Sequence, residues 1–462
     1  MSDNHTPPSS RHEFKIAILC ALPLEASALQ GVFDAHWDAE KYGKDQVDTN
    51  AYSLGVLGSH NVVLVHMANM GKVAAAVAAA NLRTSFRGIQ LALVVGICGG
   101  APFGPSGELF LGDVVISEGL VQYDLGRRLP NTFVRKDTPG ENLPRPRPEV
   151  RAILAKLQTD QGRQQLQNEM LEHLQLLRQR SDLTIPYPGA MNDRLFMLKY
   201  LHKHRRPSVC VVCYRDELCS SAMETNCEKL GCRGLDRIRI VNASNEPQPS
   251  VHFGLVATGD TVMRSGKVRD HIITRDKVIA FEMEGAGVWE TFPAALVIKG
   301  VCDYADSHKN KTWQAYAAAT AAAATKAFLE HWEITSLPEH SQDNSTEYLK
   351  TRQFETRELE IMKKFNTSPY RDRKDRNPDR VVGTCEWFIQ HHLFQDWRDS
   401  PASRLLWVSA DPGCGKSVLV KYLVDSIVLT TPKTTVCYFF FKYLSGAIIG
   451  LVMMLTSKAK IV

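Results

Sequence analysis

The 462-residue sequence lacks several features that would assign it to a special class of protein. No apolar segment stands near its start, where MSDNHTPPSSRHEF is polar, so no secretory signal is predicted. A net charge of +5, from 55 Lys and Arg against 50 Asp and Glu, is too small to predict a nucleic-acid partner. It has no repeat of fixed period, which excludes a solenoid. We therefore expect a cytoplasmic protein whose 11 cysteines are thiols or metal ligands, not disulfides.

The chain is too long for one ordinary domain, and its 44% hydrophobic and 23% charged residues can form a sizeable core. Composition shifts along the chain predict its division. The predicted parts are a disordered N-terminus (1–13), an α/β domain (14–335) with an insertion at about 131–250, a polar linker (336–380), and a second α/β unit (381–462).

Seven short apolar runs in the first domain predict strands of a mixed sheet, and several are apolar throughout, as expected of strands buried on both faces. The predicted strands are 15–22, 62–67, 91–96, 113–117, 252–258, 277–283 and 295–302. Small-residue runs at 71–82 and after Trp313 predict helices that pack closely on that sheet. Within the insertion, QQLQNEMLEHLQLLRQR predicts one polar amphipathic helix at the surface.

Three acidic residues follow predicted strands, where α/β sheets place ligand sites. Glu25 follows in CALPLEA, Glu284 closes FEME, and Asp303 lies in CDYADSH. Any one of them alone would more often be a helix cap. Glycines in VVGICGGAP and ATGDTV would let the backbone approach a ligand closely, although tight turns also explain them.

These motifs, with NMGKVAAA and LGDVVIS, stand in an order that resembles the purine nucleoside phosphorylase and nucleosidase superfamily. The resemblance runs from about Lys15 to Leu329 and is greatest to the methylthioadenosine/S-adenosylhomocysteine nucleosidases. It implies a nucleoside-phosphorylase-like mixed sheet flanked by helices. It also implies cleavage of a purine N-glycosidic bond without a cofactor, and a homo-oligomer.

The resemblance implies roles for individual residues. Asp303 would protonate the purine leaving group, Glu25 would activate water, and Glu284 would hold the ribose hydroxyls. Asp303 would need a raised pKa from an apolar setting formed by Val301, Cys302 and Tyr304. Further substrate contacts would come from Met283, Gly96, Ile97, Val262, Met263 and Cys302.

The loop after the first strand indicates which nucleophile is used. It has no Arg or Lys between Ala21 and Gln30 that could bind phosphate. We therefore expect hydrolysis of a purine nucleoside or nucleotide. Two alternatives stay open. One is a phosphorylase that binds phosphate through Arg264 or Lys72, and the other is a catalytically silent purine-sensing or scaffold module.

Five cysteines lie within 23 residues of the insertion, at positions 210, 213, 219, 227 and 232. The first two form a C-x-x-C pair, which alone is a weak indication of zinc. The spacing does not reproduce a common two-knuckle pattern. Reduced thiols are therefore the expectation, with a structural zinc site as the alternative, and no metal ligand is assigned.

In the second unit, LLWVSADPGCGKSVLVKYLVD reads as a strand, a glycine-containing loop and a helix, the context of a phosphate-binding P-loop. We expect ATP or GTP with Mg²⁺ there, and the predicted ligands are Asp411, Gly413, Cys414, Gly415, Lys416 and Ser417. With GTCEWFIQHHLFQDW before it and VCYFFFK after it, the segment resembles the start of a NACHT domain of fungal NOD-like receptors. The resemblance implies an N-terminal effector coupled to the beginning of a P-loop NTPase domain.

The last twenty residues, YLSGAIIGLVMMLTSKAKIV, fit no NACHT continuation. Their apolar stretch is short for a membrane span, so a truncated or misassigned gene end is expected and a tail anchor is the weaker alternative.

Overall fold

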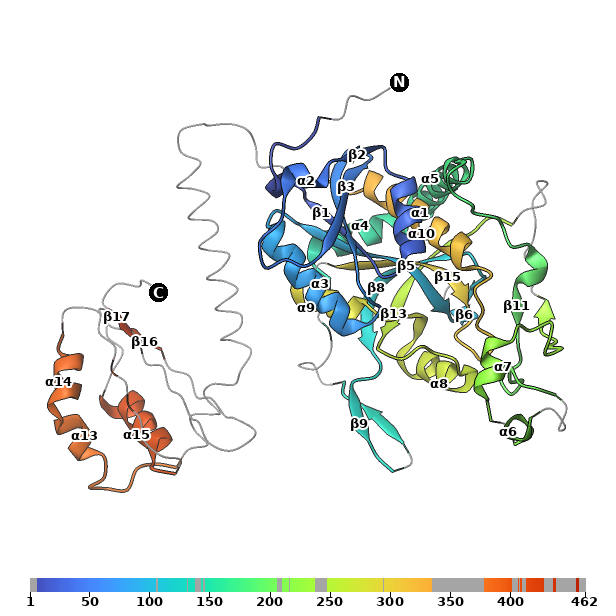
Figure 1. Ribbon diagram of the computed structural model, residues 1–462. Coiled ribbons are helices and arrows are strands. Elements are labelled where there is room, and N and C mark those ends of the chain that lie inside the picture. Colours follow the sequence, from blue (N-terminus) through green and yellow to red (C-terminus); the bar gives the residue numbers. More distant parts are fainter. Residues whose placement is uncertain are drawn as a thin grey trace. The chain divides into compact units, whose positions relative to one another are not determined.

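The computed structural model describes residues 6–104, 107–130, 132–137, 143, 146–205, 210–215, 217–236, 247–293, 295–334, 378–400, 406, 408, 413–427, 435–437 and 454–456. Two compact units divide the chain, residues 1–336 and 337–462 (Figure 1). The division lies close to the end predicted for the first domain, at residue 335.

A mixed sheet forms the centre of the first unit, as predicted. Its strand order is β14-β13-β8-β15-β5-β1-β4-β3-β2. In chain order the strands are β1 (Ile16–Cys20), β2 (Ala35–Trp37), β3 (Ala51–Leu57), β4 (His60–His66), β5 (Leu91–Gly100), β8 (Val114–Gln122), β13 (Val251–Thr258), β14 (Val278–Glu282) and β15 (Leu296–Asp303). All seven strands predicted from apolar runs are among them.

The sheet closes on itself at one end. Strand β14 pairs in parallel with β13 and antiparallel with β5, where Phe281 lies opposite Gly99. Strands β5, β15, β8, β13 and β14 therefore form a ring. The closure brings the end of β14 next to the glycines of β5.

Helices cover both faces of the sheet, which explains why several of its strands are largely apolar (Figure 1). The ideal β-carbon of Gly300 in β15 would lie 1.9 Å from the Ala317 carbonyl oxygen of α10, so only glycine allows the Ala-rich helix this close. On the opposite face, Val297 of β15 lies beside Gly285 of α9. The helices of this unit are α1 (Pro23–Gly31), α2 (Ala39–Tyr42), α3 (Lys72–Ser85), α4 (Pro148–Leu157), α5 (Asp160–Arg178), α6 (Val211–Tyr214), α7 (Ser220–Glu224), α8 (Gly266–Asp276), α9 (Gly285–Thr291) and α10 (Gln314–Glu330).

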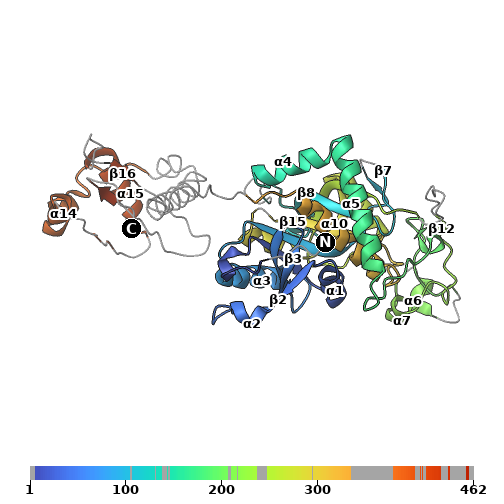
Figure 2. The same ribbon diagram turned by 90° about the horizontal axis from the view of Figure 1, so that it is seen from above.

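The first part of the predicted insertion packs on this core. Helix α5, the predicted amphipathic helix, packs on α10 and buries Leu166, Met170, Leu174 and Leu177 (Figure 2). These side chains recur on one face at the helical period. The rest of the helix is polar because only this stripe is buried.

The remaining segment carries short elements. They are the 3-10 turn η2 (Ala190–Asn192), the hairpin β11 (Arg194–Leu195) and β12 (Leu235–Asp236), and helices α6 and α7. Two further hairpins in the unit pair β6 (Phe103–Gly104) with β7 (Gly107–Glu108), and β9 (Gly126–Arg128) with β10 (Phe133–Arg135).

Residues 6–13, predicted as disordered, have defined structure. They include the 3-10 turn η1 (Arg11–Glu13), and the Tyr42 hydroxyl donates a 3.0 Å hydrogen bond to the Pro8 carbonyl. A β-carbon at Gly88 would lie 1.9 Å from the His12 carbonyl oxygen. This segment is polar in sequence but is held by backbone contacts, which composition does not indicate.

The second unit contains helices α13 (Glu386–Gln390), α14 (His392–Arg398) and α15 (Lys416–Tyr422), followed by the π-helical turn η3 (Leu423–Ile427). Strands β16 (Thr435–Cys437) and β17 (Met454–Thr456) pair antiparallel. Phe388, Phe394, Leu419 and Leu423 form its small core. Most of the predicted linker, most of the strand predicted before the P-loop and most of the apolar tail lie outside the described residues.

Candidate functional site

The three predicted carboxylates are all buried, at 3% exposure for Glu25, 4% for Glu284 and 5% for Asp303. Glu25 lies in the first turn of α1, directly after β1, and Asp303 ends β15. Strand β5 lies between β1 and β15 in the sheet. Burying carboxylates is costly even when they are paired, so their concentration around β5 indicates a site.

Backbone amides hold the carboxylate of Glu25. Its Oε2 accepts hydrogen bonds from the N–H groups of Ala21 at 3.0 Å and Leu22 at 2.8 Å, and its Oε1 accepts one from Ile97 at 2.8 Å. A carboxylate oxygen can accept about two hydrogen bonds. Among the described residues, Oε1 therefore keeps one acceptor position open, as a base that binds water requires.

Burial raises the pKa of Glu25, although the charge of Lys299 and the amide of Ile97 oppose the rise. The pKa of a general base should approach the working pH, because a stronger base takes a proton more readily. Glu25 is thus both fixed in position and a stronger base than an exposed glutamate.

Glu284 forms a buried ion pair that the sequence analysis missed. Its Oε2 lies 3.1 Å from Nζ of Lys299, and its Oε1 accepts a 3.3 Å hydrogen bond from the Gly71 amide. Burial by itself would lower the pKa of Lys299, but Glu284, Glu25 and Glu282 together outweigh it and raise the pKa. Lys299 is therefore a fixed cation among three carboxylates.

Glu282 is the second functional candidate that was missed. Its carboxylate accepts hydrogen bonds from the amides of Glu284 and Gly285. Burial raises its pKa, and the charge of Glu284 adds to the rise. Glu282 fixes the turn that presents Glu284, so it acts as a positioning residue. The sequence did contain an indication of this role, because Glu282 stands two residues before Glu284 in FEME.

The surroundings of Asp303 differ from the apolar setting that was predicted. Val301, Cys302 and Tyr304 are buried as expected. However, Nζ of Lys309 lies 2.5 Å from Oδ2 of Asp303, and the Ala305 amide donates to Oδ1 at 2.9 Å. Asp303 is therefore bound by a cation and by a backbone amide, and its setting is not purely apolar. Lys309 lies six residues downstream in a loop, so strand patterning could not place it here.

Two glycines of β5 lie directly against the two carboxylates predicted to be catalytic. A β-carbon at Gly96 would lie 2.0 Å from Oε1 of Glu25, and one at Gly99 would lie 3.0 Å from Oδ1 of Asp303. Both carboxylates are thus in contact with the same strand, at positions three residues apart in its sequence.

The other predicted substrate contacts differ in accessibility. Ile97 and Met283 are half-buried, and Val262 is 43% exposed. Met263 is buried in a cluster with Tyr123 and Phe281, so it is at least partly a core residue.

Cys302 is a buried thiol in contact with Asp303. Its Sγ donates toward the Cys98 carbonyl at 3.4 Å and toward Oδ2 of Asp303 at 3.2 Å. Burial, reinforced by the charge of Asp303, raises the pKa of Cys302 well above its ordinary value. Cys302 is therefore a neutral hydrogen-bond donor and not a nucleophile.

Lys72, one of the two alternative phosphate-binding residues, forms ion pairs with carboxylates. Its Nζ lies 2.7 Å from Asp124 and 3.6 Å from Asp260. Two carboxylates at this ammonium would repel an incoming phosphate.

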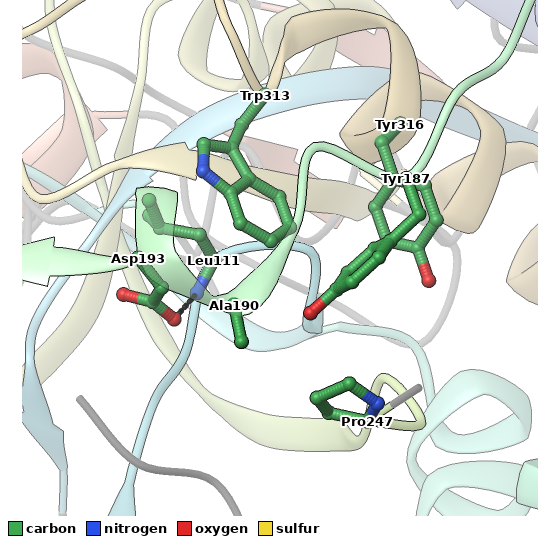
Figure 3. A pocket seen from close by; sticks show the side chains of 7 residues that line it. All are labelled: Leu111, Tyr187, Ala190, Asp193, Pro247, Trp313 and Tyr316. Atoms are coloured by element: carbon green, nitrogen blue, oxygen red, sulfur yellow. Dashed lines mark hydrogen bonds between the residues drawn. The ribbon is translucent and has the colours of Figure 1, made fainter. Parts of the chain in front are cut away.

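A pocket elsewhere in the first unit contains none of the predicted site residues. It is lined by Leu111, Tyr187, Ala190, Asp193, Pro247, Trp313 and Tyr316 (Figure 3). The Leu111 amide donates a 3.1 Å hydrogen bond to Oδ2 of Asp193, and the Tyr304 hydroxyl donates a 2.5 Å bond to Oδ1. With its carboxylate satisfied by the protein, the pocket lacks the chemistry for bond cleavage.

The predicted P-loop is described from Gly413 onward, and Asp411 lies outside the described residues. Gly413 and Gly415 have φ angles of +86° and +75°, which favour glycine. Lys416 is the first residue of α15 and Ser417 the second, while Cys414 is exposed.

Comparison with known proteins relates both units to described families. Residues 15–170 match the Phosphorylase superfamily model, and residues 383–458 match the model described as Nephrocystin 3, N-terminal. The chain thus carries a phosphorylase-superfamily domain in its N-terminal unit, and the predicted resemblance is confirmed.

Individual relatives show similarity of the same two kinds. A nucleotide-binding leucine-rich repeat (NLR)-like protein of Hyaloscypha variabilis is 29% identical over 333 residues, covering 70% of this chain and 30% of that protein. The chain therefore spans less than a third of that relative's length. A 5'-methylthioadenosine/S-adenosylhomocysteine nucleosidase of Mycobacterium bovis is 24% identical over 318 residues, covering 68% of this chain and 95% of that enzyme.

Among solved structures, a Helicobacter pylori 5'-methylthioadenosine/S-adenosylhomocysteine nucleosidase is similar, at 15% identity and a TM-score of 0.40. The match covers 69% of this chain and 99% of that one. Within the part of the chain that the structure describes, no helix is both long enough and apolar enough to cross a membrane.

Proposed function

We propose that the N-terminal unit hydrolyses the N-glycosidic bond of a purine nucleoside or nucleotide and releases the free base. The observation that carries the proposal is the placement of Glu25 and Asp303 against Gly96 and Gly99 of one strand. Such cleavage passes through an electron-poor sugar, so one group must deliver a nucleophile while another protonates the base.

Glu25 acts as the general base. Water binds at the open acceptor position of Oε1, gives a proton to the carboxylate and attacks C1′ of the sugar. The bond from C1′ to the base nitrogen breaks, and its electron pair moves into the purine. Because amides of Ala21, Leu22 and Ile97 hold the carboxylate, it does not have to reorganise during the reaction.

Asp303 delivers a proton to N7 of the leaving purine. The Lys309 ammonium donates a hydrogen bond to Oδ2 of Asp303, so it can supply the proton that Asp303 passes to N7, and Lys309 is left neutral until it takes up a proton from solvent. Glu284 accepts hydrogen bonds from the ribose hydroxyls, and its ion pair with Lys299 holds the carboxylate in position.

A phosphorylase is the second candidate, but the structure gives it less support. Lys72 is paired with Asp124 and Asp260, and the loop after β1 offers amides that already bind Glu25. Hydrolysis is therefore favoured.

The test is chromatographic detection of free base after incubation of the full chain with adenosine, methylthioadenosine, inosine, guanosine and ATP, each with and without phosphate. Release that does not depend on phosphate supports the proposal. A strict requirement for phosphate would assign the chain to the phosphorylases, and no release by folded protein would favour the silent module.

For the second unit we propose binding of ATP or GTP with Mg²⁺ at residues 411–417, as the start of a NACHT-type module coupled to the N-terminal unit. The left-handed conformations of Gly413 and Gly415 fit a bound nucleotide, since no β-carbon obstructs the approach of its phosphates. Lys416 would contact phosphate and Ser417 would ligate the Mg²⁺, which supplies charge neutralisation when bound.

A further inference from the structure

The segment between α5 and β13 collects sulfur and imidazole ligands in two groups. In each group the candidate ligand atoms all lie within 4.8 Å of one another. The first group is His204, Cys210, Cys213 and Cys219, and the second is His202, Cys227 and Cys232. All of these cysteines are unbridged.

The first group has the dimensions of a tetrahedral zinc site. Nδ1 of His204 lies 3.5 Å from Sγ of Cys213 and 3.5 Å from Sγ of Cys219, and the two sulfurs are 3.6 Å apart. Zinc bonds of about 2.3 Å to sulfur and about 2.0–2.1 Å to nitrogen, at tetrahedral angles, place sulfur atoms about 3.8 Å apart and sulfur and nitrogen about 3.6 Å apart. A disulfide would need about 2.05 Å. The atoms are thus spaced for a shared ion and not for a covalent bridge.

Backbone geometry supports the same site. The Ala222 amide donates a 3.3 Å hydrogen bond to Sγ of Cys219, which suits a thiolate ligand. Cys210 is the N-cap of α6 and Cys213 lies within that helix, so this C-x-x-C pair presents both sulfurs from a single turn.

The second group has the same spacing and a fixed histidine tautomer. Nδ1 of His202 lies 3.6 Å from Sγ of Cys227 and 3.5 Å from Sγ of Cys232. Its Nε2 lies 2.8 Å from the Thr225 carbonyl oxygen, which can only accept. Nε2 therefore carries the proton, and the lone pair of Nδ1 points to the sulfurs, the arrangement of a metal-bound histidine with its outer-shell partner.

His308 comes from a different part of the chain and lies beside the second group. It is 4% exposed, and neither ring nitrogen has a hydrogen-bond partner among the described residues. Its ring lies 5.3 Å from that of His202 and stacks on Phe196 at 3.5 Å. Oδ1 of Asp306 lies 3.7 Å from Nδ1, in position to orient the ring. Nε2 is buried beside three ligands, so it is suited to a fourth coordination bond.

The segment needs such ligation because its own core is small. Among the described residues of the segment, the buried members of its apolar cluster are Phe196, Cys213, Ala222, Leu230 and Cys232. Three of these five are not metal ligands, which is little apolar area for a segment of this length. It lies at the edge of the unit, where α6, α7 and β11 stand apart from the central sheet (Figures 1 and 2).

We propose that this segment binds two structural zinc ions. His204, Cys210, Cys213 and Cys219 form the first site, and His202, Cys227, Cys232 and His308 form the second. Each cysteine gives its proton to solvent when it binds, so the first site carries three thiolates and the second two. His308 lies in the loop that follows Asp303, and the His202 amide donates to Oγ of Ser307 in the same loop. The second ion therefore fastens the segment to the loop that holds Lys309 beside Asp303.

The test is zinc content per chain, measured by plasma mass spectrometry on the full-length protein after dialysis. The wild type should hold two zinc ions, while C213S and C227S should each hold one. H308A should lose the second ion or release it to a chelator at least tenfold faster than the wild type. C385S changes a cysteine of the second unit and should retain both ions.

A second measurement keeps the proposal testable if a variant fails to fold. In native wild-type protein, five cysteine thiols should become reactive toward a thiol reagent only after a chelator removes zinc. Cobalt loading should give charge-transfer absorption for five thiolates. Less than half an ion per chain in the wild type, with these thiols freely reactive, would overturn both sites. A single ion that is lost in C213S but kept in C227S would overturn the second.

Discussion

The carboxylate of Glu25 occupies the space that a side chain at Gly96 would fill, since a β-carbon there would lie 2.0 Å from Oε1. Glycine at this position therefore lets a buried carboxylate lie directly against the central strand. The same strand receives Asp303 at Gly99. The proposed chemistry depends on this pair of close approaches.

Gly96→Ala should displace the Glu25 carboxylate. We expect base release to fall by about 100-fold, because a shift of about 1 Å in a reacting group has that effect. Gly119→Ala is the matched control, since its β-carbon would meet only a Leu255 methyl group at 3.2 Å. Initial rates of base release decide the comparison, and equal rates in the two variants would contradict the role given to Gly96.

The acid limb of the pH profile should reflect Glu25. Burial raises its pKa above the ordinary 4.5, and the base must be ionised to accept a proton from water. Activity should therefore fall as the pH decreases through this raised pKa. The profile of kcat/KM against pH measures the limb. A limb at or below pH 4.5 would contradict the assignment of Glu25 as the base.

Glu25→Gln should lower the rate by about 10²- to 10⁴-fold, the usual contribution of a general base. Glu330→Gln, on the surface end of α10, should leave the rate unchanged. Circular dichroism of both variants checks that the fold is retained. A Glu25→Gln enzyme as active as the control would remove Glu25 from the mechanism.

Asp303→Asn should abolish protonation of the base while it preserves the shape of the side chain. We expect a loss of about 10²- to 10⁴-fold with natural purines. A substrate whose leaving group needs no proton, such as a nitrophenyl riboside, should lose much less. Equal losses with both substrates would mean that Asp303 acts in binding and not as an acid.

Lys299→Met should destabilise the first unit by about 3–5 kcal/mol, because it leaves Glu284 buried without its cation. The double variant Lys299→Met/Glu284→Met removes both charges and should recover part of that loss. Urea unfolding of the single and double variants measures the free energies. A single variant as stable as the wild type would show that the ion pair is not needed for folding.

The sequence predicted the strands well because their residues are apolar on both faces, as in β1 and β15. It missed β2 and β3, whose partly exposed residues have no continuous apolar run. Among site residues, Glu25, Glu284 and Asp303 were predicted because each stands near the C-terminal end of a predicted strand, in a motif that resembles those of the superfamily.

The cations of the site were harder to find. Lys299 stands inside an apolar strand and pairs with Gly96 in register, so its role depends on the neighbouring strand. The sequence feature that could have indicated this role is a lysine inside an otherwise apolar strand. Lys309 and His308 belong to a loop, where spacing along the chain does not fix distance in space. The histidines near the cysteines, His202 and His204, were not predicted as ligands for the same reason.

The most direct test of the central claim is to run the reaction in ¹⁸O-labelled water with phosphate present and to analyse the sugar product by mass spectrometry. Hydrolysis through Glu25 predicts a free sugar with one ¹⁸O atom at C1′, formed in equal molar amount with the base. A sugar 1-phosphate without the label would contradict water as the nucleophile, and the absence of any base release by folded protein would contradict catalysis altogether.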